Sequence, residues 1–69
     1  MDRMAVNSSN LASVGYDASN QTLEIEFHHG GVYQYYNVTE NVYIDLINAG
    51  SIGSFFSHNI KNAYQTQKI

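Results

Sequence analysis

The chain has 69 residues, no cysteine and a net charge of −3, with three fixed cations against six carboxylates. This length predicts one domain spanning residues 1–69, because a core rarely divides below roughly 100 residues. The hydrophobic fraction of 43% argues against disorder. The lack of cysteine excludes disulfides and Cys-based metal sites. The scarcity of cations disfavours nucleic-acid binding, which depends on neutralising phosphates.

The amino-terminal residues begin no apolar run, and no stretch approaches the roughly 18 apolar residues of a membrane span. We therefore expect a cytoplasmic protein with no membrane association. Residues 4–10 are rich in turn formers and are predicted to be a lead-in, with an edge strand as the alternative.

Two stretches alternate apolar and polar residues as half-buried antiparallel strands do, namely residues 12–16 and residues 22–28. Turn-forming residues separate them, and a two-residue turn at Ser19-Asn20 fits best. The register that this turn predicts pairs Tyr16 with Leu23, Val14 with Ile25 and Ala12 with Phe27. It places every apolar side chain on one face and leaves the glutamates on the other.

A third strand is predicted in residues 30–38, which read GGVYQYYNV and form the centre of the domain. The glycines permit the positive φ angles of a tight hairpin. A three-residue loop, residues 29–31, pairs Phe27 with Tyr33 and Ile25 with Tyr35, and it leaves Gln34 beside Glu26 in solvent. A two-residue Gly-Gly loop would instead turn both tyrosines to the acidic face, and we prefer the first register.

The remaining residues carry helical signals. Thr39 is predicted to be an N-cap with Val38 stapled onto Tyr43, and Ser51 is predicted to cap a second helix. The two apolar stripes comprise Val42, Tyr43, Leu46 and Ile47, then Ile52, Phe55, Phe56 and Ile60. Residues 61–69 are expected either to form a short strand or to fray. The predicted fold class is α+β: a three-stranded antiparallel β-meander followed by two short α-helices on one face (β-β-β-α-α), with a short terminal strand left open.

Four segments in this order resemble a known family: SSNLASVGYD, LEIEFHHGGVYQYYNV, AGSIGSFF and NIKNAY. Together they are similar to the KTSC domain, from about Val6 to Tyr64. The resemblance implies a small module that occurs at the C-terminus of some lysyl-tRNA synthetases and as stand-alone bacterial and phage proteins. It implies no defined activity, although it suggests RNA binding. Family members commonly carry basic residues where this chain has Gln34, Ser54 and His58.

Three further clusters have ordinary explanations. His28, His29 and His58 suggest zinc, but adjacent strand residues point to opposite faces, so we expect no metal and no cofactor. Glu24 and Glu26 lie roughly 7 Å apart on one strand face. The sequence predicts no cleft that could cover these carboxylates, so we interpret them as solvated residues of a strand face. We therefore expect that the protein is not an enzyme. Residues 51–53 suggest an anion site at a helix start, but an N-cap explains the same residues.

The segment from His58 to Tyr64 brings an amide, a cation and an aromatic ring onto a short length of chain. With the tyrosines of the third strand it suggests base stacking beside a phosphate-binding lysine. The candidate binding residues are Tyr33, Tyr35, Tyr36, Asn59, Lys61 and Tyr64. The leading prediction is a non-catalytic module that contacts a partner protein or another copy of itself through its sheet face or terminal segment. The alternatives are an RNA-binding module and a small oligomeric protein that captures a nucleotide.

Overall fold

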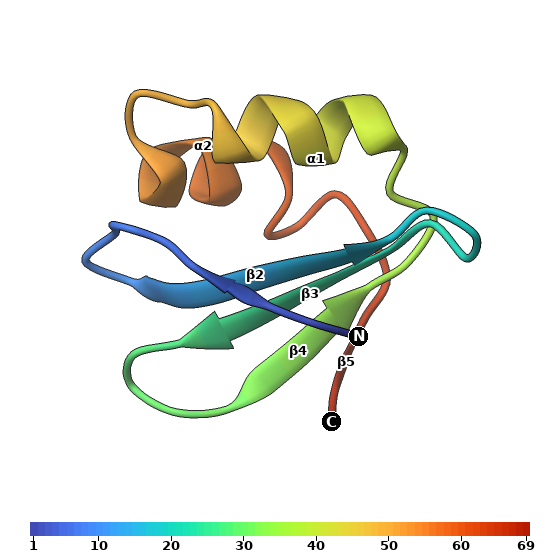
Figure 1. Ribbon diagram of the computed structural model, residues 1–69, viewed down its shortest axis with the longest axis horizontal. Helices are drawn as coiled ribbons and strands as arrows, with labels where there is room; N and C mark the ends of the chain where they lie inside the picture. The colour runs from blue at the N-terminus through green and yellow to red at the C-terminus, as the bar shows by residue number, and fades with distance from the viewer.

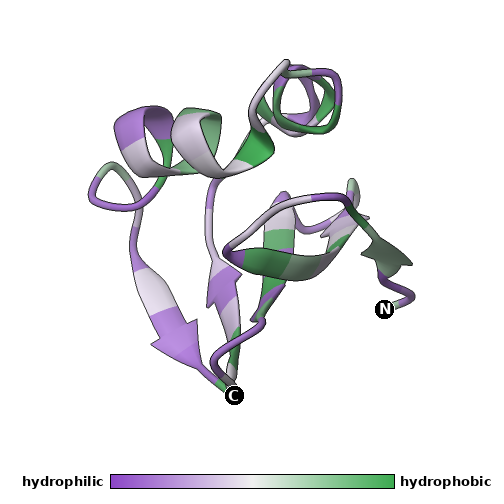
Figure 2. Cartoon of the chain, turned by 90° about the vertical axis from the view of Figure 1, so that its left-hand side faces the viewer, coloured by the Kyte–Doolittle hydropathy of each residue, from purple (hydrophilic) through white to green (hydrophobic).

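A computed structural model describes all residues, 1–69, as an antiparallel sheet with two helices packed on one face (Figure 1). Figure 2, turned by 90°, shows both helices on the same side of the sheet. The elements in chain order are β1 Met4–Ala5, β2 Leu11–Asp17, β3 Thr22–Phe27, β4 Val32–Tyr35, α1 Glu40–Ile47, α2 Ile52–Asn59 and β5 Thr66–Lys68. Neither helix is long and apolar enough to cross a membrane.

The sheet has five strands in the order β1-β2-β3-β4-β5, so the chain builds it largely as a meander. The predicted α+β class, the three central strands and the two helices are confirmed. The prediction of three strands is too small, because β1 and β5 add one short strand at each edge. Their two and three residues are too few to produce a recognisable alternation. The alternatives of an edge strand in residues 4–10 and a strand in the tail are the correct ones.

The register between β2 and β3 agrees with prediction over most of its length. Tyr16 pairs with Leu23 and Val14 pairs with Ile25. The predicted pairing of Ala12 with Phe27 is wrong, since a register shift between Leu11 and Ser13 sets Leu11 opposite Phe27. Such a bulge inserts one residue and reorients those before it. Its result is that Leu11 is fully buried in the core.

The predicted register between β3 and β4 is wrong by two residues. Tyr33 pairs with Ile25 and Tyr35 pairs with Leu23. The connecting loop has four residues, His28 to Gly31, and Phe27 N–H donates to Gly31 O at 3.1 Å. Gly30 and Gly31 adopt φ angles of 111° and 89°, which L-residues rarely take.

A shift of two residues preserves the side-chain face, because side chains alternate with a period of two. Tyr33 and Tyr35 therefore lie on the same face as Leu23 and Ile25, as predicted. Gln34 lies beside Glu24 rather than beside Glu26.

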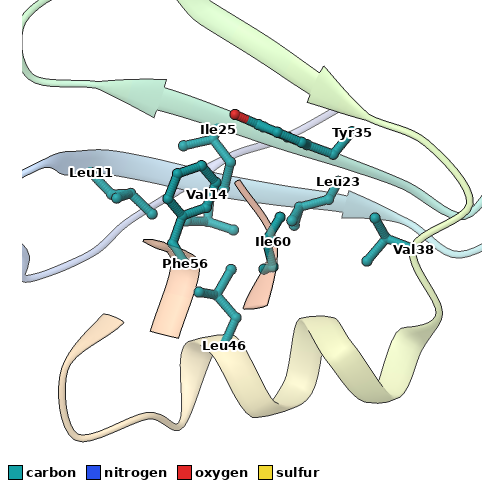
Figure 3. Close-up of a cluster of buried hydrophobic side chains, with 9 residues drawn as sticks. All are labelled: Leu11, Val14, Leu23, Ile25, Tyr35, Val38, Leu46, Phe56 and Ile60. Atoms are coloured by element: carbon teal, nitrogen blue, oxygen red, sulfur yellow. The ribbon is translucent and has the colours of Figure 1, made fainter. Parts of the chain in front are cut away.

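The core lies between the sheet and the helices (Figure 3). Leu46 of α1 and Phe56 of α2 point toward the sheet residues, and Ile60 just after α2 is fully buried. The nine buried hydrophobic residues are Leu11, Val14, Leu23, Ile25, Tyr35, Val38, Leu46, Phe56 and Ile60. The predicted stripes supply this core or pack against it.

The two helix starts differ. Both predicted N-cap positions, Thr39 and Ser51, are extended as a cap requires. The Ser51 hydroxyl accepts the Ser54 N–H at 3.2 Å, but the Thr39 side chain makes no capping hydrogen bond. At this junction Tyr16 OH donates to the carbonyl of Val38 at 2.5 Å instead. The Tyr16 ring also stacks on Tyr43 with ring centroids 4.8 Å apart.

Candidate functional site

A groove of about 430 Å³ opens between the sheet and α2. We call it the aromatic groove. Strands β3 and β4 supply part of its wall, α2 supplies another part, and the loops before β2, after β3 and after α2 complete it. Its lining residues are Asn10, Phe27, His29, Tyr33, Tyr35, Phe56, Ser57 and Lys61.

Aromatic rings pack against one another in the walls of the groove. Phe27 lies at the centre, edge-on to Tyr33 and to Phe56 with ring centroids 5.5 Å apart in each case. Tyr35 packs edge-on against Phe56 at the same separation. His29 stacks on Phe27 at 5.3 Å. Edge-to-face pairs of this kind fix ring orientations and contribute about 0.5–1.5 kcal/mol each.

The exposure of these rings decides which of them a ligand could reach. Tyr35 and Phe56 are only 4% and 5% exposed and form the floor. Phe27 and Tyr33 are half-buried, and His29 is exposed. Burial raises the pKa of the Tyr35 hydroxyl, so it remains a neutral phenol at physiological pH. The groove therefore offers accessible ring surface at its mouth above an apolar floor.

Lys61 brings the positive charge to the groove. It follows α2 and is exposed, and its backbone N–H donates to Phe56 O at 3.0 Å, which anchors the start of the side chain. The sole ion pair in the structure joins Arg3 to Glu24, so the Lys61 ammonium has no carboxylate partner. An unpaired cation beside aromatic rings suits a ligand that combines a flat ring with an anionic group.

The structure brings three of the six candidate binding residues together in this groove: Tyr33, Tyr35 and Lys61. The other three lie elsewhere. Tyr36 is on the opposite sheet face, where its hydroxyl donates to Gln34 Oε1 at 3.1 Å. The Asn59 amide donates to Phe55 O at 3.1 Å, and Tyr64 packs against the core.

Sequence reasoning missed five lining residues: Asn10, Phe27, His29, Phe56 and Ser57. Phe27 and Phe56 read as core residues because they fall in apolar stripes, and Phe56 is indeed buried. Asn10 lies in the loop before β2, and the bulge that follows it is not predicted by any pattern in the sequence. Of these residues only Phe27 has a signal in the sequence that marks it as accessible: it is the last apolar residue before a glycine turn.

A second hollow of about 420 Å³ lies beside the first and is lined almost entirely by polar residues. It includes residues 51–53, the predicted anion site, and it shares Asn10 and Ser57 with the aromatic groove. The Ser51 hydroxyl is already engaged in capping α2. Anion binding at this helix start stays a prediction.

The three histidines have separate surroundings. His28 Nε2 lies 2.9 Å from Ser8 O, and His58 Nδ1 lies 2.8 Å from Ser54 O. His29 stacks on Phe27 in the aromatic groove. Each ring is thus engaged by a different element.

The expectation that Glu24 is solvated is wrong. Glu24 is 5% exposed, and Arg3 donates to its carboxylate. Gln34 Nε2 donates to its other oxygen at 2.9 Å. The hydrogen bond from Gln34 is the largest cause that lowers the pKa of Glu24, and the hydrogen bond and positive charge of Arg3 lower it further. Together they outweigh burial, which acts to raise this pKa. A carboxylate held ionised in this way is unsuited to donate a proton near neutral pH.

The second glutamate, Glu26, is half-buried on the same strand face. Ser13 Oγ donates to its carboxylate at 2.9 Å, and Ser13 also accepts from Arg3 Nε at 3.0 Å. The pair of glutamates therefore belongs to a hydrogen-bonded network and not to an open acid–base site.

Comparison with known proteins shows which family has this sequence and this architecture. The sequence model of the KTSC domain matches residues 7–64. An uncharacterised protein of Stutzerimonas stutzeri is 43% identical over 61 residues, covering 88% of this chain and 86% of the relative. The lysine–tRNA ligase of Nostoc punctiforme is 38% identical over 59 residues, which are 86% of this chain but 10% of the ligase. The crystal structure of a KTSC domain protein from Yersinia pestis has a TM-score of 0.96 at 41% identity, covering 99% of this chain and 96% of that one.

Proposed function

This chain belongs to the KTSC domain family, and we propose that it is a non-catalytic binding module and that the aromatic groove is its ligand site. The observation that carries the proposal is the juxtaposition of Lys61, a cation without a carboxylate partner, with the half-buried rings of Phe27 and Tyr33.

The chemistry of the groove favours a nucleotide. A nucleobase supplies a flat ring for the Phe27 and Tyr33 side chains, and base–aromatic stacking is worth about 1–3 kcal/mol per base. The attached phosphate supplies the anion for Lys61. Asn10 and Ser57 line the same groove and offer an amide and a hydroxyl for the polar edges of a base or sugar.

The free nucleotide and the end of an RNA strand share this chemistry. One relative bears on the second source: it is a lysine–tRNA ligase, and the match to this chain spans a tenth of its length. Of the three fixed cations, Arg3 is paired with Glu24, so Lys61 and Lys68 remain for phosphates. Each phosphate neutralised on a single strand contributes about −0.7 to the slope of log K against log salt. RNA binding by one copy would therefore depend only shallowly on salt.

A thermal-shift screen with the four nucleoside monophosphates and short RNA oligomers tests this proposal. A ligand that binds only the folded state raises the melting temperature. We expect a nucleotide to raise it for the native chain and for Lys61→Arg, which keeps the charge, but not for Lys61→Ala. Lys68→Ala removes one positive charge outside the groove lining and is expected to respond like the native chain. No response to any nucleotide or oligomer would contradict the proposal.

A further inference from the structure

The N-terminal segment, residues 1–5 (blue in Figure 1), forms the edge strand β1 with Met4 and Ala5. Residues 1–3 lie against Gly15 on the face of the sheet opposite the helices, here the back face. Strand β1 pairs with β2 through Met4 opposite Val14 and Ala5 opposite Ser13. Both β1 residues are exposed. Two exposed residues of strand pairing contribute little burial, so most of the specific attachment lies elsewhere in the segment.

Arg3 supplies that attachment. Its Nε donates to Ser13 Oγ at 3.0 Å, and a terminal nitrogen of the same guanidinium donates to the Glu24 carboxylate. The planar guanidinium thus donates to two acceptors at once, the Ser13 hydroxyl and the Glu24 carboxylate. Only arginine has this geometry, because a lysine ammonium is a point charge without a planar fork.

The acceptors are held in place without Arg3. Gln34 Nε2 donates to Glu24 at 2.9 Å, and Ser13 Oγ donates to Glu26 at 2.9 Å. These groups come from three adjacent strands of the sheet, β2, β3 and β4. The pocket for the guanidinium is therefore built on a rigid surface, whereas the guanidinium arrives on a short terminal strand.

Gly15 completes this pocket as a notch for the segment's backbone. A Cβ atom at this position would lie 2.6 Å from Asp2 O and 3.1 Å from Arg3 Cγ. No side chain fits there while the segment is in place. The back face is thus shaped to the backbone of an extended segment as well as to its arginine.

The charges fix what can occupy this surface. Glu24 and Glu26 lie on one face of β3, and Arg3 is the only cation paired with either. Without Arg3 the buried Glu24 carboxylate keeps only the Gln34 amide as a donor and has no cation beside it, so an occupant that brings a cation is favoured. The residues that form the pocket lie within the family match at 7–64, and Arg3 lies outside it.

We propose that the back face of the sheet is a docking site for an extended, arginine-bearing segment of a partner protein, and that in this chain the N-terminal segment occupies the site in cis. The incoming segment adds to the edge of β2 in place of β1, as in strand addition, and its guanidinium takes the position of Arg3 between Ser13 and Glu24. This site is separate from the aromatic groove, which lies on the helix side of the sheet.

The test uses the full chain and a synthetic amidated peptide with the sequence of residues 1–6. The receptor is Arg3→Ala, which removes the competing guanidinium and keeps Gly15, so that the notch can still accept the backbone of an incoming segment in place of residues 1–3. NMR titration follows the backbone amides of Ser13 and Gly15 and the side-chain amide of Gln34. We expect the peptide to bind Arg3→Ala at least about tenfold more tightly than it binds the native chain, a difference of about 1.4 kcal/mol.

Two controls locate the site. A peptide with glutamine in place of arginine is expected not to bind, and adding Gly15→Ala to the receptor is expected to abolish binding by closing the notch. Arg3→Lys serves as a second receptor if Arg3→Ala does not fold, because it retains a charge without the fork. Equal affinity of the two peptides, equal affinity of the native and variant chains, or no binding to either receptor would overturn the proposal.

Discussion

The guanidinium of Arg3 and the carboxylate of Glu24 meet on the back of the sheet, where the Glu24 side chain is 6% exposed and the Arg3 side chain 30%. This pair ties the amino terminus of the chain to its central strand. It also explains why an acidic strand face is compatible with a stable sheet, since the carboxylate has donors on both oxygens.

Removal of the arginine tests the strength of this tie. Arg3→Ala leaves Glu24 buried with only Gln34 as a donor, and an unsatisfied buried group costs about 1–3 kcal/mol. We expect a loss of unfolding free energy in that range by urea denaturation. Arg3→Lys should lose less, because it retains the charge. A loss within experimental error for Arg3→Ala would show that the pair contributes nothing to stability.

The lowered pKa of Glu24 predicts an acid dependence of stability. The folded pKa lies below the ordinary value of 4.5, so the unfolded chain binds the proton first as the pH falls. The stabilisation is therefore fully present above that ordinary value and is lost as the pH falls through the folded pKa. Urea unfolding across the acid range should show a weaker pH dependence for Glu24→Gln than for the native chain. An identical profile would exclude Glu24 as a source of acid sensitivity.

Tyr35 forms the floor of the aromatic groove and is 4% exposed. Tyr35→Ala removes a buried ring between the sheet and Phe56 and should cost about 3–5 kcal/mol of unfolding free energy. Tyr35→Phe keeps the ring and should cost less than about 1 kcal/mol. Circular dichroism melting of both variants compares them. A loss below about 1 kcal/mol for Tyr35→Ala would place the side chain outside the core.

The helix starts provide a matched pair of substitutions. Ser51→Ala removes the hydroxyl that accepts the Ser54 N–H and should cost about 1 kcal/mol. Thr39→Ala removes no capping hydrogen bond and should change stability by less than about 0.5 kcal/mol. Sequence reasoning alone assigns about 1 kcal/mol to Thr39 as well. Equal losses in the two variants would contradict the difference between the caps.

Much of the fold follows from local pattern. The alternation in residues 22–28 and the register from Val14 to Tyr16 are predictable, because one face must be buried and a one-residue slip would expose it. The bulge before Ser13 and the four-residue loop after Phe27 are not predictable in the same way. Either change preserves an apolar face, so the pattern of residues cannot distinguish between the alternatives.

The candidate sites are less predictable for a different reason. Tyr33 and Lys61 are separated by 28 positions and meet only because α2 folds back over the sheet. The burial of Glu24 depends on a segment 21 residues away in the chain, and Arg3 shows no periodic relation to it. Residue type alone groups Tyr36 with Tyr33 and Tyr35, but alternation along the chain places its hydroxyl on the back face, where it donates to Gln34.

The most direct measurement of the central claim is an NMR titration of the uniformly labelled chain with adenosine monophosphate, repeated with Lys61→Ala. We expect saturable shifts at Phe27, Tyr33 and Lys61, little change at Glu24 on the back face, and loss of these shifts in Lys61→Ala with its fold intact. The same groove shifts at equal nucleotide concentration in Lys61→Ala, or no shifts in the native chain, would contradict a nucleotide site in the aromatic groove.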